Sequence, residues 1–155
     1  GDRSPTVADL PRLAWTRAVI DEVLRLYPPV WMVPRRALAE DEIRGYRIPA
    51  GTDVLLSVYS LHRHPDFWPD PERFDPGRFA GDCPGRQAGA YLPFGAGPRS
   101  CLGSRVGLLE AVLVVAAVAR RFRLELVPGH PVEPEASLTL RPRHGLAVRV
   151  RERAR

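Results

Sequence analysis

The chain has 155 residues, of which 45% are apolar, 8% aromatic and 26% charged, and this is the length and balance of one globular domain. Disordered and collagen-like classes are therefore excluded. The 23 basic residues are all arginine and outnumber 18 acidic residues to give a net charge of +5, and the lack of lysine excludes a P-loop or Schiff-base chemistry.

The arginines alternate with acidic residues and form no long basic tract, so no nucleic-acid surface is expected. The basic C-terminus is interpreted as a charged, frayed end. Two cysteines, Cys83 and Cys101, have neither the number nor the spacing of a disulfide framework or a zinc site. This cysteine usage favours a reducing, cytoplasmic location. Residues 1–5 are polar and contain no apolar signal segment.

The first predicted element is an amphipathic helix that Asp9 would cap, with Pro11 in its first turn. Apolar residues recur in it at helical spacing, at Leu13, Ile20, Leu24 and Tyr27. Pro28 and Pro29 would end it. Glu22 and Arg25 lie three residues apart and so project from one side of this helix. By pattern alone they form a surface ion pair worth less than about 1 kcal/mol.

Residues 35–58 alternate short apolar runs with turn residues, which predicts two or three short antiparallel strands. Residues 62–93 follow as a proline-rich coil without helical or strand periodicity. This coil also contains the aromatic residues Phe67, Trp68, Phe74 and Phe79. So long a coil within a domain is usually functional, and its aromatic content predicts that it packs against another part of the protein.

Residues 106–119 are apolar on every side except at Glu110, which predicts a buried core helix too short to span a bilayer. Three arginines at 120, 121 and 123 suit the C-terminus of this helix. Strands are then expected at residues 124–127, 138–140 and 146–150, paired as small hairpins.

The most informative segment runs from Phe94 to Gly103, directly before the apolar helix. Its glycines, Gly95, Gly97 and Gly103, permit a flat or bulky group to approach the backbone closely. Cys101 lies just ahead of the helix N-terminus, where unpaired N–H groups and the helix dipole favour a thiolate. Arg99 adds a nearby cation.

Several chemistries could use such a cysteine. A nucleophile would need a histidine base, but none of His62, His64, His130 and His144 has a recognisable partner pattern. A zinc site would need further ligands at close spacing. A buried cysteine in a glycine-rich turn remains an alternative without function. A thiolate bound axially to haem iron would use every feature of the loop.

Three motifs resemble those of the cytochrome P450 family. Residues 94–103 match its haem-binding pattern Phe-Gly-x-Gly-x-Arg-x-Cys-x-Gly at every fixed position. Residues 22–25 resemble the Glu-x-x-Arg motif of its K helix, and residues 71–74 resemble its Pro-Glu-Arg-Phe element. The resemblance covers nearly all of the chain and implies an α+β fold. It would be the C-terminal part of the P450 domain, with K and L helices, small antiparallel strands and a proline-rich meander.

Roles follow from the resemblance residue by residue. It implies that Cys101 is the iron ligand and that Glu22, Arg25 and Arg73 form a buried ion triad, rather than a surface pair, that locks the coil beneath the haem. Arg99 and Arg35 would bind the haem propionates, with Arg36 as the alternative to Arg35. Other haem contacts would come from Phe94, Gly95, Leu102 and Gly103. The substrate pocket would be lined by Val30, Trp31, Met32, Val33, Leu138 and Thr139.

The resemblance also implies a function: insertion of one oxygen atom of O₂ into a small apolar substrate, with electrons from a ferredoxin or flavodoxin. Members of the family are two to three times longer, so residues 1–155 would be a partial domain. The N-terminal majority, including the I helix that delivers protons to dioxygen, would be absent. The alternative is a non-catalytic fragment that binds haem weakly or not at all and exposes apolar surface.

Overall fold

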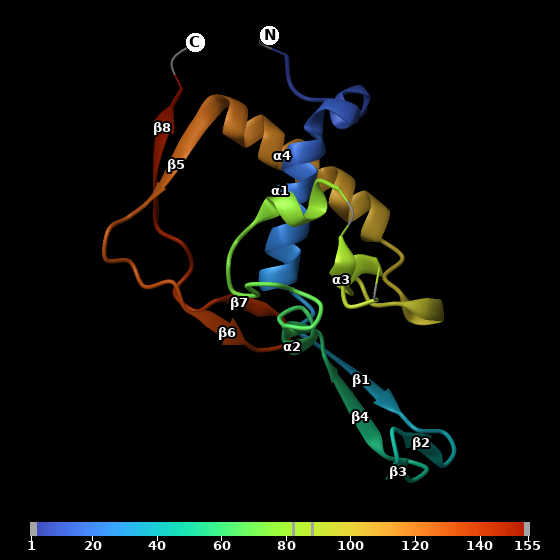
Figure 1. Cartoon of the computed structure of the whole chain (residues 1–155). Helices are drawn as coiled ribbons and strands as arrows, with labels where there is room; N and C mark the ends of the chain where they lie inside the picture. Colours follow the sequence, from blue (N-terminus) through green and yellow to red (C-terminus); the bar gives the residue numbers. More distant parts are fainter. Residues whose placement is uncertain (1–2, 82, 88, 154–155) are drawn as a thin grey trace.

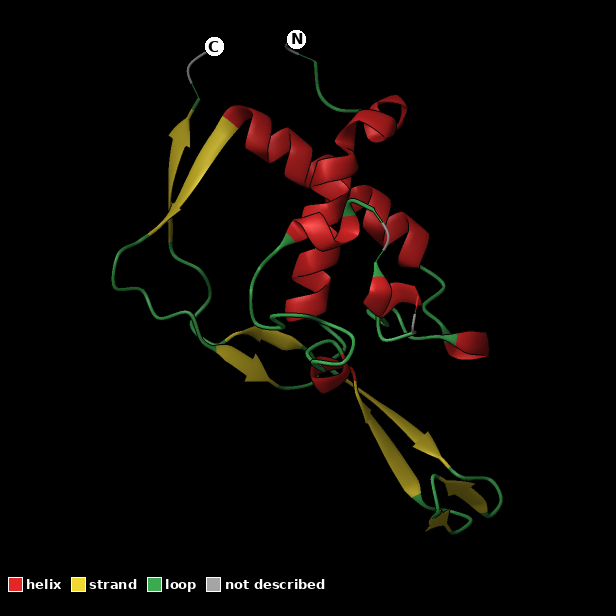
Figure 2. Ribbon diagram, in the orientation of Figure 1, coloured by secondary structure: helices red, strands yellow, loops and turns green. Residues whose placement is uncertain are grey.

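The computed structural model describes residues 3–81, 83–87 and 89–153. Its helices are η1 (Val7–Leu13), α1 (Ala14–Leu26), α2 (Val58–Leu61), η2 (Pro76–Phe79), α3 (Pro84–Gln87), η3 (Gly97–Arg99) and α4 (Ser104–Arg121). Its strands are β1 (Met32–Arg36), β2 (Asp41–Ile43), β3 (Tyr46–Ile48), β4 (Asp53–Ser57), β5 (Phe122–Leu126), β6 (Pro134–Ala136), β7 (Leu140–Pro142) and β8 (Val148–Glu152). Helices α1 and α4 cross at the centre, and the strand pairs lie around them (Figures 1 and 2).

The N-terminal helix begins earlier than predicted and in a tighter form. Thr6 is its N-cap, while Asp9 lies inside η1 and accepts a hydrogen bond from the Thr6 N–H at 2.9 Å. Pro11 has no N–H to donate, and the chain stays a 3₁₀ helix through Leu13 before α1 begins. As predicted, α1 stops just before Pro28, which cannot continue a helix.

All strands form two-stranded antiparallel ribbons. β1 pairs with β4, and the β2–β3 hairpin lies at the far end of this ribbon (Figure 1). Residues 35–58 therefore hold more strands than predicted, and Val58 already belongs to α2.

In the C-terminal part, β6 and β7 form a hairpin whose turn contains Leu138 and Thr139, which the sequence pattern placed in a strand. β5 pairs with β8 instead of forming a local hairpin, and the two enclose the β6–β7 hairpin in the sequence.

The coil over residues 62–93 supplies much of the core, as its aromatic content predicted. Trp68 is 1% exposed, and its ring lies 5.9 Å from that of Phe79 and 6.2 Å from that of Tyr91. Tyr91 also packs on His62, with ring centroids 5.3 Å apart. Phe74 is the exception, because it is about half exposed. A coil held by buried rings can carry a fixed loop at its end without regular secondary structure.

Helix α4 is less buried than its composition predicted. Only Val112 is buried among its described side chains, whereas Val106, Val114, Val115 and Val118 are all exposed. Its main contacts with other helices are with α1 and η1, so the described part of the chain leaves most of its side chains at least partly exposed. No helix in the described part of the chain is long and apolar enough to cross a membrane.

Candidate functional site

A buried ion pair lies on the face of α1 that meets the coil. Arg25 donates from Nε to Glu22 Oε2 at 2.7 Å and from Nη2 to Oε1 at 2.8 Å. Both side chains are 0% exposed. The surface pair expected from the pattern alone is therefore wrong. Spacing along the helix brings the two charges together, but the coil that covers them is distant in sequence.

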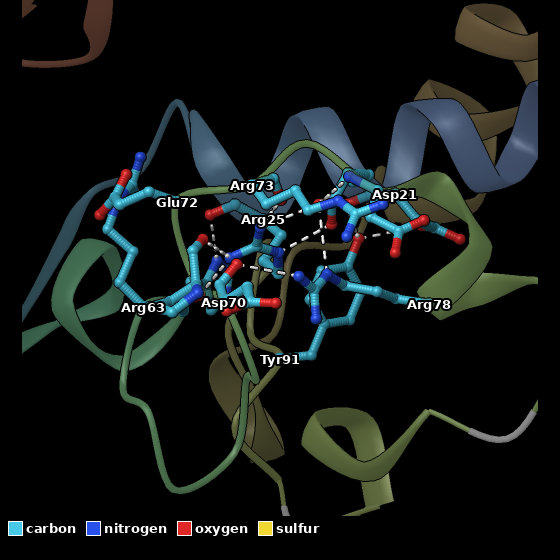
Figure 3. A network of polar contacts seen from close by, with 12 residues as sticks. Asp21, Arg25, Arg63, Asp70, Glu72, Arg73, Arg78 and Tyr91 are labelled. Carbon is cyan, nitrogen blue, oxygen red and sulfur yellow. Dashed lines mark hydrogen bonds and ion pairs between the residues drawn. The ribbon is translucent and has the colours of Figure 1, made fainter.

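The remaining hydrogen-bonding capacity of this pair holds the coil to α1 (Figure 3). Arg25 Nη1 donates to the carbonyl oxygens of His62 at 2.8 Å and Pro71 at 2.7 Å, and Nη2 donates to the Arg73 carbonyl at 3.2 Å. Glu22 Oε1 accepts from the Asp75 backbone N–H at 2.8 Å. Burying the pair is tolerable because its charges are satisfied by backbone dipoles as well as by each other.

The arginine that completes the charged cluster is Arg78, not Arg73. Arg78 Nε lies 3.6 Å from Glu22 Oε1, and its side chain is only 12% exposed. Its Nη2 donates to the Asp70 carbonyl at 2.9 Å. Arg73 is exposed and contributes its backbone carbonyl instead. The Pro-x-Arg-Phe pattern occurs twice, at 71–74 and 76–79, and the η2 turn formed by the second copy directs its arginine to α1.

This assignment predicts different effects of two matched substitutions. Arg78→Ala should lower the free energy of unfolding by about 1–2 kcal/mol, because a nearly buried cation and its carbonyl bond are lost. Arg73→Ala keeps the backbone carbonyl that Arg25 binds, so it should change the free energy of unfolding by less than about 0.5 kcal/mol. Urea titrations of the two variants measure both values. If Arg73→Ala lowered the free energy of unfolding more than Arg78→Ala, Arg73 would be the third residue of the triad, as the sequence predicted.

His62 joins α1 to the segment that enters the cysteine loop. Its ring is fully buried, with Nδ1 3.1 Å from the Arg25 carbonyl oxygen and Nε2 accepting from the Leu92 N–H at 2.8 Å. Burial, with the nearby Arg25 and Arg63 cations as smaller contributions, lowers its pKa to about 4. Sequence reasoning considered His62 only as a catalytic base and found no signal for this role.

Asp21 of α1 binds Tyr91, the residue before Leu92. The Tyr91 hydroxyl donates to the Asp21 carboxylate and lies equally close to its backbone oxygen, at 3.0 Å in each case. Arg17 at 2.9 Å and Arg86 at 3.1 Å neutralise the carboxylate. Burial first, and the Asp21 charge second, raise the pKa of Tyr91 above its usual range, so the hydroxyl stays a donor.

The loop that follows presents the thiol of Cys101. The Cys101 N–H donates to the Phe94 carbonyl at 2.8 Å, which closes the loop. Gly95 and Gly97 have φ of +72° and +69°, a conformation that other residues rarely adopt. Cys101 lies three residues before α4, whose N-cap is Gly103. Cys101 is exposed, whereas Cys83 is buried, and both are free thiols.

Two predicted propionate ligands have guanidinium groups without an acidic partner. Arg35 donates to the Pro34 carbonyl at 2.8 Å, and Arg99 is exposed on η3. Within residues 3–81, 83–87 and 89–153, no carboxylate pairs with either of them. The alternative to Arg35, Arg36, is paired with Asp53 across the β1–β4 ribbon at 2.8 Å. Alternation along β1 points neighbouring side chains to opposite faces, so only Arg35 remains available.

The two predicted pocket segments lie together. Trp31 Nε1 donates to the Ser137 carbonyl at 2.8 Å, and the Leu140 N–H donates to the Pro29 carbonyl at 2.9 Å. These bonds place residues 30–33 beside the turn that contains Leu138 and Thr139. Of the predicted haem contacts, Leu102 is fully exposed, and Phe94 and Gly95 are partly buried.

The site can supply a single exposed sulfur ligand and two unpaired guanidinium groups. No cluster of three metal-binding side chains of the His, Cys, Asp or Glu type occurs in the described part of the chain. Any metal held by Cys101 must therefore obtain its other ligands from outside these side chains. An iron macrocycle that carries its own nitrogen ligands and carboxylates satisfies this requirement.

Comparisons with known proteins show the family of the chain. The family model described as "Cytochrome P450" matches residues 1–149. Over 154 residues, the chain is 48% identical to a protein of Mycobacterium bovis named "Putative cytochrome P450 132", covering 99% of this chain and 33% of that protein. It is 53% identical over 128 residues to a "Cyclooctat-9-en-7-ol 5-monooxygenase" of Streptomyces melanosporofaciens, covering 82% of this chain and 28% of that one.

Solved structures give the same result. The haem domain of cytochrome P450DA superposes with a TM-score of 0.90 at 34% identity, covering 99% of this chain and 34% of that one. Retinoic acid-bound cyanobacterial CYP120A1 has a TM-score of 0.90 at 33% identity, covering 96% and 35%. The chain spans about a third of the length of these relatives. Since the family model covers nearly every residue, from the N-terminal helix to β8, the chain belongs to the cytochrome P450 family.

Proposed function

We propose that the chain forms the part of a haem-thiolate monooxygenase that lies beneath the haem and supplies its proximal ligand. The observation that carries this proposal is the exposed Cys101 thiol on a closed glycine-rich loop at the start of α4. The coil that precedes the loop is held against α1 by the buried Glu22–Arg25 pair and its hydrogen bonds.

The residues present fit haem. Cys101 would ligate the iron, and Arg35 and Arg99 would each bind a propionate through the guanidinium geometry that suits a carboxylate. A methyl group added at Gly97 would meet no protein atom within 4 Å, so the loop surface is open at this residue. When bound, haem supplies the chemistry that inserts one oxygen atom of O₂ into an organic substrate. The chain's own contribution is to hold the sulfur and the propionates.

The substrate is proposed to be a small apolar molecule. Residues 30–33 and the turn with Leu138 and Thr139 are mostly apolar and lie next to each other. Val30 is about half exposed and Leu138 almost wholly exposed, so both are available to a ligand. The retinoic acid in CYP120A1 and the alcohol named for the Streptomyces relative are organic molecules, which supports this substrate class.

Electrons would come from a ferredoxin or flavodoxin bound on the Cys101 side. Arg105 lies four residues after Cys101 and is exposed. An exposed cation near the electron's entry point favours an acidic donor and speeds its association.

Residues 1–155 alone are proposed not to turn over substrate. Apolar side chains of α4 and of the β5–β8 ribbon are exposed, including Val114, Leu124, Val148 and Val150. The relatives have about twice as much additional chain, and exposed apolar surface of this kind normally contacts further protein.

Haem titration of matched arginine variants tests the proposed site. Arg35→Gln should weaken haem binding about tenfold, because a charge-assisted hydrogen bond to a propionate is lost. Arg36→Gln removes a guanidinium from the other face of the same strand and should leave the affinity unchanged. Equal effects of the two variants, or no haem binding by the parent chain, would contradict the assignment.

A further inference from the structure

Two consecutive residues anchor the coil just before the cysteine loop begins. The Tyr91 side chain is tied to Asp21, and the Leu92 backbone N–H is tied to His62. The next residues, from Phe94 to Cys101, form the loop itself, whose closing hydrogen bond uses the Phe94 carbonyl. The position of residues 91 and 92 relative to α1 therefore sets where the loop starts.

The hydrogen bonds of His62 fix its tautomer. Nε2 faces an N–H donor, so it must carry a lone pair, and Nδ1 faces the Arg25 carbonyl oxygen, so it must carry the proton. The neutral ring thus links a helix carbonyl on one side to a coil N–H on the other. A side chain that could only donate, or only accept, would break one of these two links.

Burial and two nearby cations disfavour a second proton on His62, and they outweigh the backbone oxygens of Arg25 and Leu24, which favour it. From α1 comes the Arg25 cation, and from the coil come the Arg63 cation and the ring of Tyr91, which is stacked on His62. Trp68 meets the ring at 66° with centroids 6.5 Å apart. Of the two buried carboxylates of α1, Glu22 is paired with Arg25 and Arg78, and Asp21 with Arg17 and Arg86.

We propose that His62 is a positioning residue for the cysteine loop, holding Leu92 at a fixed place on α1 through its acceptor nitrogen Nε2. That His62 thereby places Cys101 for iron rests on the proposed function. The hydrogen bond from Leu92 to Nε2 of His62 is independent of the proposed function.

The same geometry makes the link sensitive to acid. Protonation turns Nε2 into a donor that faces the Leu92 donor, so the bond is lost. The pKa of His62 is lowered from 6.5 to about 4 in the folded chain, so the unfolded chain takes up the proton first as pH falls. The stability supplied by the neutral ring is therefore complete above about pH 6.5 and is lost as pH falls toward 4.

Hydrogen exchange of the Leu92 amide, compared between two variants, tests the proposal. His62→Gln can place Oε1 near the position of Nε2 and accept from Leu92, whereas His62→Asn can reach only the position of Nδ1. At pH 7 the protection factor should stay within about threefold of the parent in His62→Gln and fall at least about tenfold in His62→Asn. The Ala37 amide, bonded to the Thr52 carbonyl just beyond the β1–β4 ribbon, is the control.

A pH series on the parent chain gives a second, independent readout. Between pH 6 and 4, Leu92 protection should fall relative to Ala37, and in His62→Gln this relative fall should be absent because Gln does not titrate. Equal protection in the two variants, or a parent series in which Leu92 and Ala37 change together, would overturn the proposal. Neither readout uses haem, so a failure of haem binding is seen separately and leaves these results interpretable.

Discussion

Replacing Arg25 by alanine is expected to lower the free energy of unfolding by about 3–5 kcal/mol. The substitution leaves the Glu22 carboxylate fully buried without its bidentate partner. It also removes the donors to the His62 and Pro71 carbonyls, which hold the coil against α1. Urea denaturation followed by circular dichroism measures the loss.

The control for Arg25→Ala is an arginine in an exposed ion pair of similar length. Arg47 Nη2 lies 2.6 Å from Glu40 Oε2, and the two side chains are 74% and 57% exposed. Because solvent already screens this pair, Arg47→Ala should cost at most about 1 kcal/mol. If the two variants are equally stable, burial of the Glu22–Arg25 pair has no energetic consequence. The buried pair would then not be what holds the coil against α1.

The second large effect is expected at Gly85. This residue is buried against the Trp68 ring, and a Cβ at its position would lie 2.5 Å from Cε2 and 2.6 Å from Cη2. Trp68 is 1% exposed and enclosed by other rings, so it cannot easily move away. Gly85→Ala should therefore destabilise the chain by about 3 kcal/mol, at the upper end of the usual cost of overpacking.

Gly107 provides the opposite control. It lies in α4, where an added Cβ would meet no atom within 4 Å. Gly107→Ala should stabilise the chain by about 0.5–1 kcal/mol through helix propensity alone. Thermal denaturation should show a lower melting temperature for Gly85→Ala and a higher one for Gly107→Ala than for the parent chain. A neutral Gly85→Ala would mean that the aromatic cluster is loosely packed.

The sequence predicted features that depend on local pattern. Helix α1 ends before Pro28, the ribbons are antiparallel, and the proline-rich coil packs its Trp68. The environment of Glu22 and Arg25 could not be read from helical periodicity, because the covering residues are 37 to 53 positions away. It came from the family resemblance instead.

The same limit explains the errors. Choosing between Arg73 and Arg78 required the direction of the η2 turn, since both arginines stand in the same four-residue pattern. Helix α4 has the composition of a buried helix, but composition does not show which neighbours cover it, and this chain covers little of it. His62 gave no signal because its role depends on two backbone groups that no side-chain motif reports.

The central claim is that the Cys101 sulfur is a haem iron ligand. It is tested most directly by the absorption spectrum of the haem-loaded, reduced, carbon monoxide-bound chain beside that of Cys101→Ala. Thiolate ligation predicts the red-shifted band typical of this family in the parent chain and its loss in the variant, while Cys83→Ala keeps it. The same band in Cys101→Ala, or no such band in the parent, would contradict the account.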